Sequence, residues 1–368
     1  MSTRVLHVFG SMDIGGAEMR TLELLQAIQD QEIAFDFAVL SGRKGALAAD
    51  FEALGATIFP VPLGRTFPQE FMRLVRRQKY DVVHSHVATF SGLILLIAAI
   101  AGVPKRIAHF RSDGDGHPDT LRRIVQRSTM KYLIGRFATD IVGVSPSALS
   151  HGYRKDWEND RKARVIVNGL TTENPTVDIR LKLRRLIEVD ESTPLVMHVG
   201  RPSPEKNRPR VVDVFQAIHE EMPTAHLVFI GGEGSDSNEL RDKISDSGLG
   251  QHIHEIGRRK NAAELTAGAD LLLLTSVREG LPGVVLEAAS RGTPVVSSAV
   301  AGAVFISQHL TDVITLELTE SNDQWARVCL DLMTRGSGDR TSNIKTFASS
   351  IFSQERTIQA NLKLYERQ

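Results

Sequence analysis

Two glutamates, Glu279 and Glu287, stand eight positions apart in the segment SVREGLPGVVLEAASRGTPVV. The apolar run at 269–276 predicts a buried strand, and the turn after it predicts a helix that begins near Pro282. One carboxylate then lies on the loop, and the other lies one helical turn inside. At the carboxyl end of such a strand, carboxylates can accept hydrogen bonds from the vicinal hydroxyls of a sugar or ribose. The alternative is a surface helix with two solvated acids.

Three cations follow another predicted strand. In residues 193–218 an apolar run ends at Gly200, and Arg201, Lys206 and Arg208 precede a predicted helix. A helix N-terminus offers free N–H groups and the positive end of a dipole, Arg binds phosphate in bidentate fashion, and Lys adds a compact charge. The junction therefore predicts an anion site.

A third strand-to-helix junction, at residues 225–240, contains Gly231, Gly232 and Gly234. Glycines without side chains let the backbone approach a ligand closely, although a plain loop explains them equally well. Taken together, the three junctions predict a site for a phosphorylated sugar.

The composition sets limits on the class of protein. A chain of 368 residues with 42% hydrophobic residues suits two domains with a core each. With one cysteine, Cys329, no intrachain disulfide can form, and with no secretory signal in the sequence a reducing cytoplasm is the expected location. The apolar stretch at 93–103 is too short for a membrane span, which needs ~20 residues, and is expected to be a buried helix. A net charge of zero argues against nucleic-acid binding.

The two halves of the chain differ in charge. Residues 1–170 hold 22 Lys and Arg against 17 Asp and Glu, and the remainder holds 22 against 27. The excess of cations gathers at 73–79 and at 121–137, where Arg122, Arg123, Arg127 and Lys131 share much of one predicted helix face. A solvated surface is the default interpretation; contact with an anionic acceptor or with the inner face of the membrane is the alternative.

Short apolar strands alternate with longer amphipathic helices, which predicts an α/β fold with doubly wound, Rossmann-like parallel sheets. The polar stretch at 171–193 interrupts the alternation, so we place one domain at 1–171 and a second at 172–352. The expected strands are 4–10, 34–40, 57–61, 81–86, 105–110, 139–145 and 164–168, then one from 194, and 225–231, 252–256, 269–275, 293–298 and 312–316.

Nearly the whole chain resembles the GT-B glycosyltransferases of the retaining family GT4, the glycosyl transferases group 1. Their C-terminal domain has a strand that ends in Gly-Arg, a Lys a few residues on, and two Glu with seven residues between them. Here these positions are Gly200, Arg201, Lys206, Glu279 and Glu287.

The first half carries the resemblance in GSMDIGGAEMRTLELLQAI, which holds Gly15 and Gly16, and in DVVHSH, RIAHFRSDG, GVSPSAL and VIVNGL. Where the family commonly has an Asp soon after Asn-Gly, this chain has Leu170, Thr171 and Thr172, so no role is carried over to that position. The resemblance implies a GT-B fold with an interdomain cleft, an N-terminal acceptor domain, a C-terminal nucleotide-sugar domain, and a helix at 353–368 that crosses back to the N-terminal domain.

The resemblance also implies roles in the C-terminal domain. Arg201 and Lys206 are expected to hold the diphosphate of a nucleotide sugar and to offset the charge of the leaving group. Glu287 is expected on the ribose and Glu279 on the transferred sugar. Other expected donor contacts are the backbone of Leu281 and Gly283, next to Pro282, which has no N–H, together with Gly232 and, near the base, Arg258.

In the N-terminal domain, the resemblance places His109 beside the donor sugar, whereas a lone His at a strand end is more often structural. Gly15 and Gly16 are expected to let their loop close over the phosphate. Alternation sends His84 and His86 to the same side of the sheet, and His86 is the candidate acceptor contact.

A metal is not expected. Asp113 and Asp115 have the spacing of a metal-binding pair, but the resemblance favours cations and helix dipoles in place of a metal, so SDGDG is interpreted as a loop.

The expected activity is transfer of a hexose-type sugar, with retention, from a nucleoside diphosphate sugar, UDP-linked by preference, to a hydroxyl acceptor. Cell-surface polysaccharide, lipid-linked glycan and secondary-metabolite synthesis all fit. The alternatives are a GT-B sugar-nucleotide epimerase, which needs no acceptor, and a non-catalytic nucleotide-sugar-binding subunit.

Overall fold

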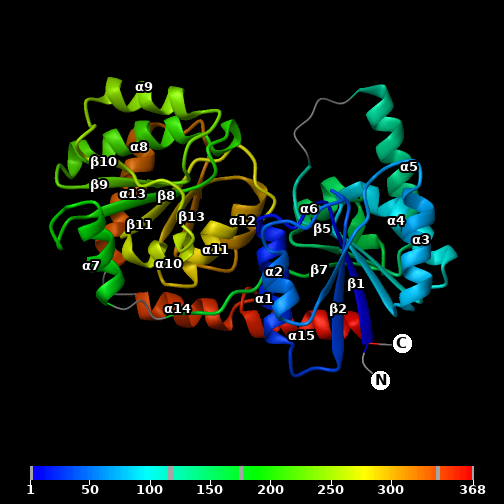
Figure 1. The fold of residues 1–368 in the computed structure, drawn as a ribbon. Coiled ribbons are helices and arrows are strands. Elements are labelled where there is room, and N and C mark those ends of the chain that lie inside the picture. Colours follow the sequence, from blue (N-terminus) through cyan, green and yellow to red (C-terminus); the bar gives the residue numbers. More distant parts are fainter. Residues whose placement is uncertain (1–2, 115–119, 174–176, 337–339, 367–368) are drawn as a thin grey trace. The chain divides into compact units, whose positions relative to one another are not determined.

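The computed structural model describes residues 3–114, 120–173, 177–336 and 340–366. Contacts within the chain define two compact units (Figure 1). Unit 1 comprises Met1–Gly169 with Gln354–Gln368, and unit 2 comprises Leu170–Ser353.

Within the described residues, unit 1 is built on a parallel seven-stranded sheet with the order β3-β2-β1-β4-β5-β6-β7. The strands are β1 (Thr3–Phe9), β2 (Ile33–Val39), β3 (Thr57–Pro60), β4 (Val82–Ser85), β5 (Lys105–Phe110), β6 (Asp140–Gly143) and β7 (Ala163–Val165). The predicted strands of this half are confirmed, with ends that differ by three residues or fewer.

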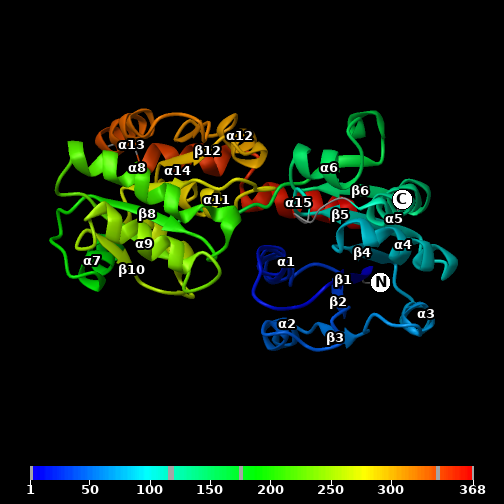
Figure 2. The same cartoon turned by 90° about the horizontal axis from the view of Figure 1, so that it is seen from above.

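Helices cover both faces of this sheet (Figure 2). They are α1 (Gly16–Ala27), α2 (Ala48–Ala53), α3 (Phe67–Gln78), α4 (Ser91–Ile100), α5 (Leu121–Phe137), α6 (Pro146–Gly152) and α15 (Gln354–Tyr365), with short 3-10 helices at Ala88–Phe90 and Trp157–Asn159. The apolar stretch at 93–103 forms α4, a largely buried helix, as predicted. None of the described helices has the length and apolar character of a membrane span.

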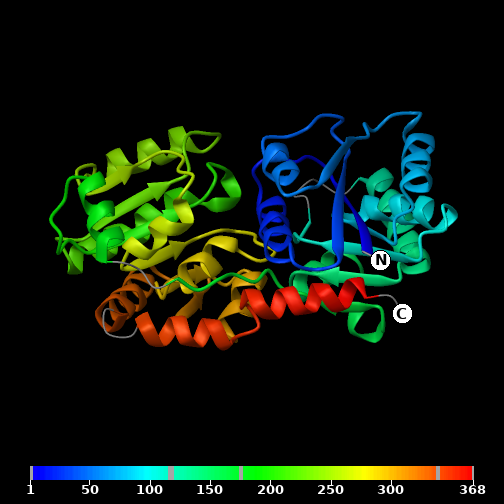
Figure 3. The same ribbon diagram turned by 60° about the horizontal axis from the view of Figure 1, so that its bottom comes forward.

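The C-terminal helix α15 belongs to unit 1 and lies next to its sheet (Figure 3, red). Its Leu364 and Tyr365 lie in the same buried apolar cluster as Phe35 and Phe37 of β2. Lys105 Nζ at the start of β5 donates to the carbonyl of Glu366 at 3.0 Å. The last residues of the chain thereby reach the core of the unit that the first residues form.

Within the described residues, unit 2 contains a parallel six-stranded sheet with the order β10-β9-β8-β11-β12-β13. Its strands are β8 (Leu195–Val199), β9 (His226–Ile230), β10 (Ile253–Glu255), β11 (Leu271–Leu274), β12 (Val295–Ser298) and β13 (Val313–Leu316). The buried run Leu271–Leu274 shows why the strand signal was strong: a strand covered on both faces is apolar at every position.

The helices of unit 2 are α7 (Val177–Leu186), α8 (Arg208–Glu221), α9 (Ser237–Ser247), α10 (Ala262–Leu265), α11 (Gly283–Ala289), α12 (Ala301–Ser307), α13 (Asn322–Gly336) and α14 (Arg340–Ser349), with 3-10 helices at Pro204–Lys206 and Thr266–Gly268. Phe215 of α8 and Trp325 of α13 lie in one buried cluster.

In both sheets, the order in which the chain adds strands reverses once. In unit 1 the chain moves outward from β1 and returns on the other side at β4; in unit 2 it does so between β8 and β11. Loops at the carboxyl ends of the two strands at such a switch point diverge and leave a crevice, which is where doubly wound sheets bind ligands.

Candidate functional site

The switch point of unit 2 brings the loops after β8 and β11 together. Thr275 Oγ1 donates to the carbonyl of Asn207 at 2.9 Å, and the N–H of Val277 donates to the carbonyl of Glu205 at the same distance. Two segments some seventy residues apart in the chain are thus joined by backbone and side-chain bonds. The loop with Lys206 and the loop with Glu279 are therefore held directly against each other.

Lys206 and Glu279 form an ion pair at this switch point, with 2.5 Å between Nζ and Oε1. The hydroxyl of Ser276 donates to the same carboxylate oxygen at 3.0 Å. Both charged side chains are about 15% exposed (16% and 15%). The sequence predicted the cation and the acid at separate strand-to-helix junctions of one site for a phosphorylated sugar, and the structure places the two side chains in direct contact.

Arg201 and Arg208 are placed differently from one another. Arg201 is exposed, and it makes no hydrogen bond or ion pair with another described residue. Arg208 is buried, and its guanidinium donates to both carboxylate oxygens of Asp236, at 2.9 and 2.5 Å. The expectation that Arg208 joins the anion site was wrong, because its charge is already matched inside the protein.

The glycines after β8 and β9 allow close backbone packing. A Cβ on Gly231 would lie 1.8 Å from the carbonyl oxygen of Gly200, so no side chain fits there. Gly232 has a φ of 84°, in the left-handed region that favours glycine, and a Cβ on it would lie 3.6 Å from Cβ of Arg258. Arg258 itself is exposed. The structure therefore brings Gly232 and Arg258 together at neighbouring strand ends.

The helix predicted near Pro282 is α11, for which Pro282 is the N-cap and Gly283 the first residue. Leu281 is buried, and Glu287 lies one turn inside the helix and is partly buried. The turn is held closely from one side, since a Cβ on Gly302 of α12 would lie 2.4 Å from the carbonyl oxygen of Gly280. The acid pair therefore has the loop-and-helix placement that its spacing predicted.

At the switch point of unit 1, the loop after β1 carries Gly15 and Gly16. Gly15 has extended backbone and caps α1, which begins at Gly16. The carbonyl of Gly15 accepts from the N–H of Met19, the first turn of the helix. Both glycines therefore lie at the N-terminus of α1, in the loop that follows β1.

A hydrogen-bonded chain of three side chains includes His109. His109 Nδ1 lies 3.0 Å from His84 Nε2, and His84 Nδ1 lies 2.8 Å from the hydroxyl of Tyr365. The two imidazole rings are stacked, with centroids 5.1 Å apart. All three side chains are buried. The chain runs from α15 through β4 to β5.

A second hydrogen-bonded chain includes His86. Nε of Arg111 donates to His86 Nδ1 at 3.1 Å, and His86 Nε2 lies 2.9 Å from His7 Nδ1. His84 and His86 lie on the same side of the sheet, as alternation predicted, with ring centroids 4.2 Å apart. Both ring nitrogens of His86 are engaged in these bonds.

Burial controls the protonation of these rings. It lowers the pKa of His7 to about 3 and holds the pKa values of His84, His86 and His109 well below the ordinary value, with the charge of Arg111 acting in the same direction. Burial also lowers the pKa of Arg111, to about 10, which leaves it charged at neutral pH. The rings in unit 1 are neutral imidazoles beside the charged guanidinium of Arg111.

Three of these rings could in principle bind a metal. In the described part of the chain, His7, His84 and His86 form the one group whose ligand atoms all lie within 4.8 Å of one another. A metal there would compete with the bonds described above and would lie beside the Arg111 guanidinium. Asp113 accepts from the hydroxyl of Ser147 at 3.1 Å, and its expected partner Asp115 lies outside the described residues.

Sequence reasoning did not single out Arg111 and Arg20, which lie close to His109. They line a cavity of about 30 Å³, enough for one water molecule, together with His109, Asn168 and Thr357. Arg111 also donates to Asn168 Oδ1 at 3.3 Å. The available signal was its position two residues after His109, since alternate residues of a strand point to the same face.

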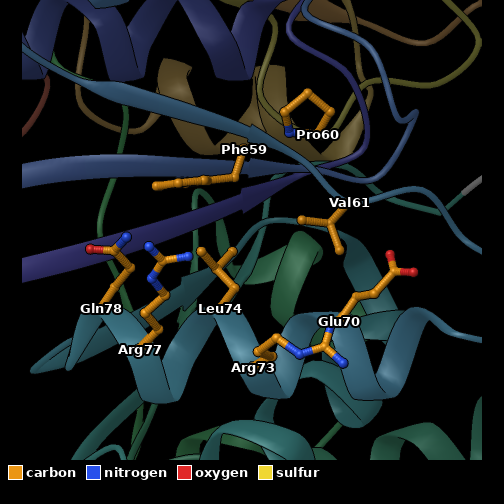
Figure 4. Close-up of a pocket in the computed structure, with 8 residues that line it drawn as sticks. All are labelled: Phe59, Pro60, Val61, Glu70, Arg73, Leu74, Arg77 and Gln78. Carbon is orange, nitrogen blue, oxygen red and sulfur yellow. The ribbon is translucent and has the colours of Figure 1, made fainter.

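A separate groove of about 280 Å³ lies between the edge strand β3 and helix α3 (Figure 4). Its lining residues are Phe59, Pro60, Val61, Glu70, Arg73, Leu74, Arg77 and Gln78. Arg73 and Arg77 are exposed, as the default interpretation of the basic segment 73–79 predicted.

Two doubly wound parallel-sheet units, each with polar side chains at its switch point, define the GT-B fold. Solved structures share it: the Anabaena Alr3699/HepE structure in complex with UDP and glucose has a TM-score of 0.80 at 19% identity, and covers 98% of both chains. The TarM structure has a TM-score of 0.76 at 10% identity, over 100% of this chain and 99% of the other.

The sequence model of the family described as "Glycosyl transferases group 1" matches residues 180–334, and that of the "Glycosyl transferase 4-like domain" matches residues 15–169. The chain belongs to this family of GT4-type glycosyltransferases. Among curated proteins it is 28% identical to the capsular polysaccharide biosynthesis glycosyltransferase CapH of Staphylococcus aureus, over 98% of both chains. It is 26% identical to the putative glycosyltransferase EpsF of Bacillus subtilis, over 98% of this chain and 96% of that one.

Proposed function

We propose that the protein transfers a hexose-type sugar from a UDP-sugar to a hydroxyl acceptor, with retention of the anomeric configuration and without a metal. The observation that carries the proposal is the Lys206–Glu279 pair at the switch point of unit 2, where a phosphate and a sugar hydroxyl can be bound side by side. UDP and glucose in the HepE structure support the choice of donor.

The cations act on the leaving group. As the bond from the sugar C1 to the phosphate oxygen breaks, negative charge grows on the diphosphate, and Lys206 and the exposed Arg201 offset it. The acceptor oxygen forms the new bond to C1 from the same face, and its proton passes to an oxygen of the leaving diphosphate. The bond formed, the bond broken and the proton are all accounted for, so the reaction needs no further base or co-reactant.

The remaining contacts to the UDP-sugar are assigned to residues at the strand ends and on α11 of unit 2. Glu287, one turn inside α11, accepts from the ribose hydroxyls, and the carboxylate of Glu279 accepts from the transferred sugar. The N–H groups of Leu281 and Gly283 flank Pro282, which has none, and meet the sugar. The backbone at Gly232 and Arg258 contacts the base.

In unit 1, His109 lies beside the donor sugar, and Gly15 and Gly16 let their loop approach the phosphate. The acceptor contact expected of His86 is not carried further, since both its ring nitrogens are engaged with Arg111 and His7.

The acceptor is proposed to be a lipid-linked glycan of cell-surface polysaccharide synthesis. The name of CapH supports the pathway, and the surface of α5 supports contact with a membrane. On α5, Leu121, Val125 and Tyr132 are 82%, 65% and 70% exposed, and their spacing places them in one stripe of the helix. Arg122 and Arg136 beside the stripe are also exposed, and an apolar stripe flanked by cations suits an anionic bilayer surface.

The test is a transfer assay with a panel of UDP-hexoses and a lipid-linked acceptor, with proton NMR of the product's anomeric coupling. An α-linked product from an α-linked donor is expected. An isomerised donor formed without acceptor would identify an epimerase, and nucleotide-sugar binding without turnover would identify a non-catalytic subunit. Either result would overturn the proposal.

A further inference from the structure

We propose that Tyr365 acts through His84 to hold His109 in the tautomer that carries its proton on Nε2, so that His109 offers the substrate a hydrogen-bond donor and not a base. Tyr365 and His84 are positioning residues in this scheme. The inference rests on the proposed function, in which His109 lies beside the donor sugar.

The contacts form one line through unit 1. The hydroxyl of Tyr365 lies 2.8 Å from His84 Nδ1, and His84 Nε2 lies 3.0 Å from His109 Nδ1. The exposed fractions of the three residues are 1%, 1% and 3%. Water is therefore excluded from both bonds, so the two inner hydrogens must find their acceptors within the chain of three. A hydrogen on His109 Nε2 faces the cavity beside it, which has room for one water molecule.

Only one direction of donation uses every inner hydrogen. The rings are neutral because burial lowers their pKa values, so each carries one N–H. If Tyr365 donates to His84 Nδ1, the proton of His84 lies on Nε2 and points to His109 Nδ1. The proton of His109 must then lie on its Nε2.

The reverse direction leaves a buried hydroxyl without an acceptor. With the proton of His84 on Nδ1, Tyr365 would become the acceptor of that bond. Among the described residues, the hydroxyl of Tyr365 has no bonding partner other than His84, so its own hydrogen would be unpaired in a water-free site. An unpaired buried donor is strongly disfavoured, and this sets the direction of the chain.

The consequence falls on the outer nitrogen of His109. In the described structure Nε2 of His109 is buried and has no hydrogen-bond partner, and the residue lines the small cavity with Arg111 and Asn168. An Nε2–H can donate to a hydroxyl or phosphate oxygen of the donor. It has no lone pair there with which to accept the proton of the acceptor hydroxyl.

The first measurement reads the tautomer directly. In protein labelled with ¹⁵N-histidine, long-range proton–nitrogen NMR separates protonated from unprotonated ring nitrogens, and a His109→Gln sample assigns the signals. Wild type is expected to show protonated Nε2 in His109, and Tyr365→Phe is expected to shift it toward a mixture of tautomers. Unprotonated Nε2 in wild type, or no change in Tyr365→Phe, would overturn the proposal.

Tyr80→Phe is the matched control. Tyr80 is also buried in unit 1, at 3% exposure, and its hydroxyl donates to Asp36 at 2.9 Å, with no bond to the histidines. Both variants lose one buried hydroxyl, so they are expected to show similar loss of stability. Only Tyr365→Phe is expected to alter His109.

The second measurement is kinetic. Tyr365→Phe is expected to lower kcat roughly threefold to tenfold with little change in KM for the donor, while Tyr80→Phe retains kcat. Equal kcat values in the two variants would show that the tautomer has no role in transfer and would overturn the positioning role. The NMR arm needs neither donor nor acceptor, so failure of the proposed function and failure of the relay are distinguishable.

Discussion

At the scale of single residues, the Lys206–Glu279 pair sets the electrostatics of the proposed donor site. One oxygen of Glu279 already accepts from both Lys206 and Ser276, so the carboxylate restrains the ammonium group as well as being available to a sugar. A phosphate that enters this crevice must compete with the carboxylate for Lys206. The two glutamates of the site therefore have different expected effects on nucleotide binding.

The first prediction separates these glutamates. Glu287→Ala is expected to weaken binding of UDP and UDP-sugar alike by ~1.5 to 3 kcal/mol, roughly tenfold to a hundredfold, because the ribose that Glu287 is proposed to bind belongs to both. Glu279→Ala is expected to leave UDP affinity intact or to raise it, since Lys206 is released, while transfer falls steeply. Calorimetry with UDP and steady-state kinetics measure the two effects.

The control for this pair is Glu239→Ala, which removes an exposed carboxylate on α9 of the same unit and is expected to change neither quantity. Loss of UDP binding in Glu279→Ala with normal binding in Glu287→Ala would mean that the two roles are exchanged.

The second prediction concerns metal. Because Arg201, Lys206 and the helix N-termini are proposed to supply the positive charge that the diphosphate needs, transfer is expected to survive excess EDTA. Elemental analysis of the treated enzyme confirms removal, including from the His7, His84 and His86 group. Activity that disappears with EDTA and returns with magnesium or manganese would contradict the metal-free mechanism.

At the scale of elements, α5 stands out because much of its apolar surface faces solvent. Leu121, Ile124, Val125 and Tyr132 are among the exposed large apolar side chains of the described chain. One cation of the helix is already engaged within the protein, because Nζ of Lys131 donates to the carbonyl of His151 at 2.7 Å. The apolar stripe, with Arg122 and Arg136 beside it, carries the membrane proposal.

The third prediction tests this helix. Wild type is expected to sediment with vesicles that contain anionic lipid, less so at high salt. Val125→Asp is expected to abolish sedimentation, because it places a charge in the apolar stripe. Arg122→Gln is expected to weaken it by ~1 kcal/mol, roughly fivefold.

Arg241→Gln on α9 is the control for the loss of a surface charge, since its side chain is 50% exposed. Val125→Asp that sediments as well as wild type would rule out α5 as the contact surface.

At the scale of the whole molecule, both units bury neutral histidines. His7, His84 and His109 lie in unit 1, and His198, fully buried on β8, lies in unit 2 with Nδ1 bonded to the carbonyl of Leu273. Burial lowers the pKa of His198 to about 3. A group whose pKa is lowered in the folded state stays neutral there while the unfolded chain takes up a proton, so stability falls as pH drops below ~6.5.

The fourth prediction follows from that sign. Between pH 7.5 and 5.5, each fully buried histidine is expected to cost up to ~1.4 kcal/mol of unfolding free energy, about three quarters of it below pH 6.5. His198→Asn keeps a donor near Leu273 but cannot titrate. It is expected to remove the contribution of one buried histidine to the loss of unfolding free energy of unit 2 at low pH. The measurement is urea unfolding followed by Trp325 fluorescence in a Trp157→Phe background, because the two tryptophans lie in different units.

His151→Asn replaces an exposed histidine and is expected to leave the pH dependence unchanged. A pH dependence in His198→Asn as steep as that of wild type would contradict the account.

Local patterns were sufficient for the elements and for part of the site. The run Leu271–Leu274 predicted a strand, and the turn before Pro282 predicted the start of α11, because these signals depend on neighbouring residues. Closeness in sequence also led to one wrong prediction. Arg208 is close to Arg201 and Lys206 in the chain, but it is the first residue of α8, and its guanidinium points inward to Asp236.

By itself, the sequence determined the alternation of strands and helices, the strand-end positions of the glycines, and the spacing of Glu279 and Glu287, because each is encoded within a few residues. Only the tertiary structure decided which distant side chains meet. Lys206 and Glu279 are 73 positions apart, and His84 and Tyr365 are 281 positions apart. Strand order brings the first pair together at a switch point, and the docking of the last helix brings the second pair into contact. Contacts between residues so far apart leave no local signal, because the same periodicity of strands and helices is compatible with many different long-range contacts.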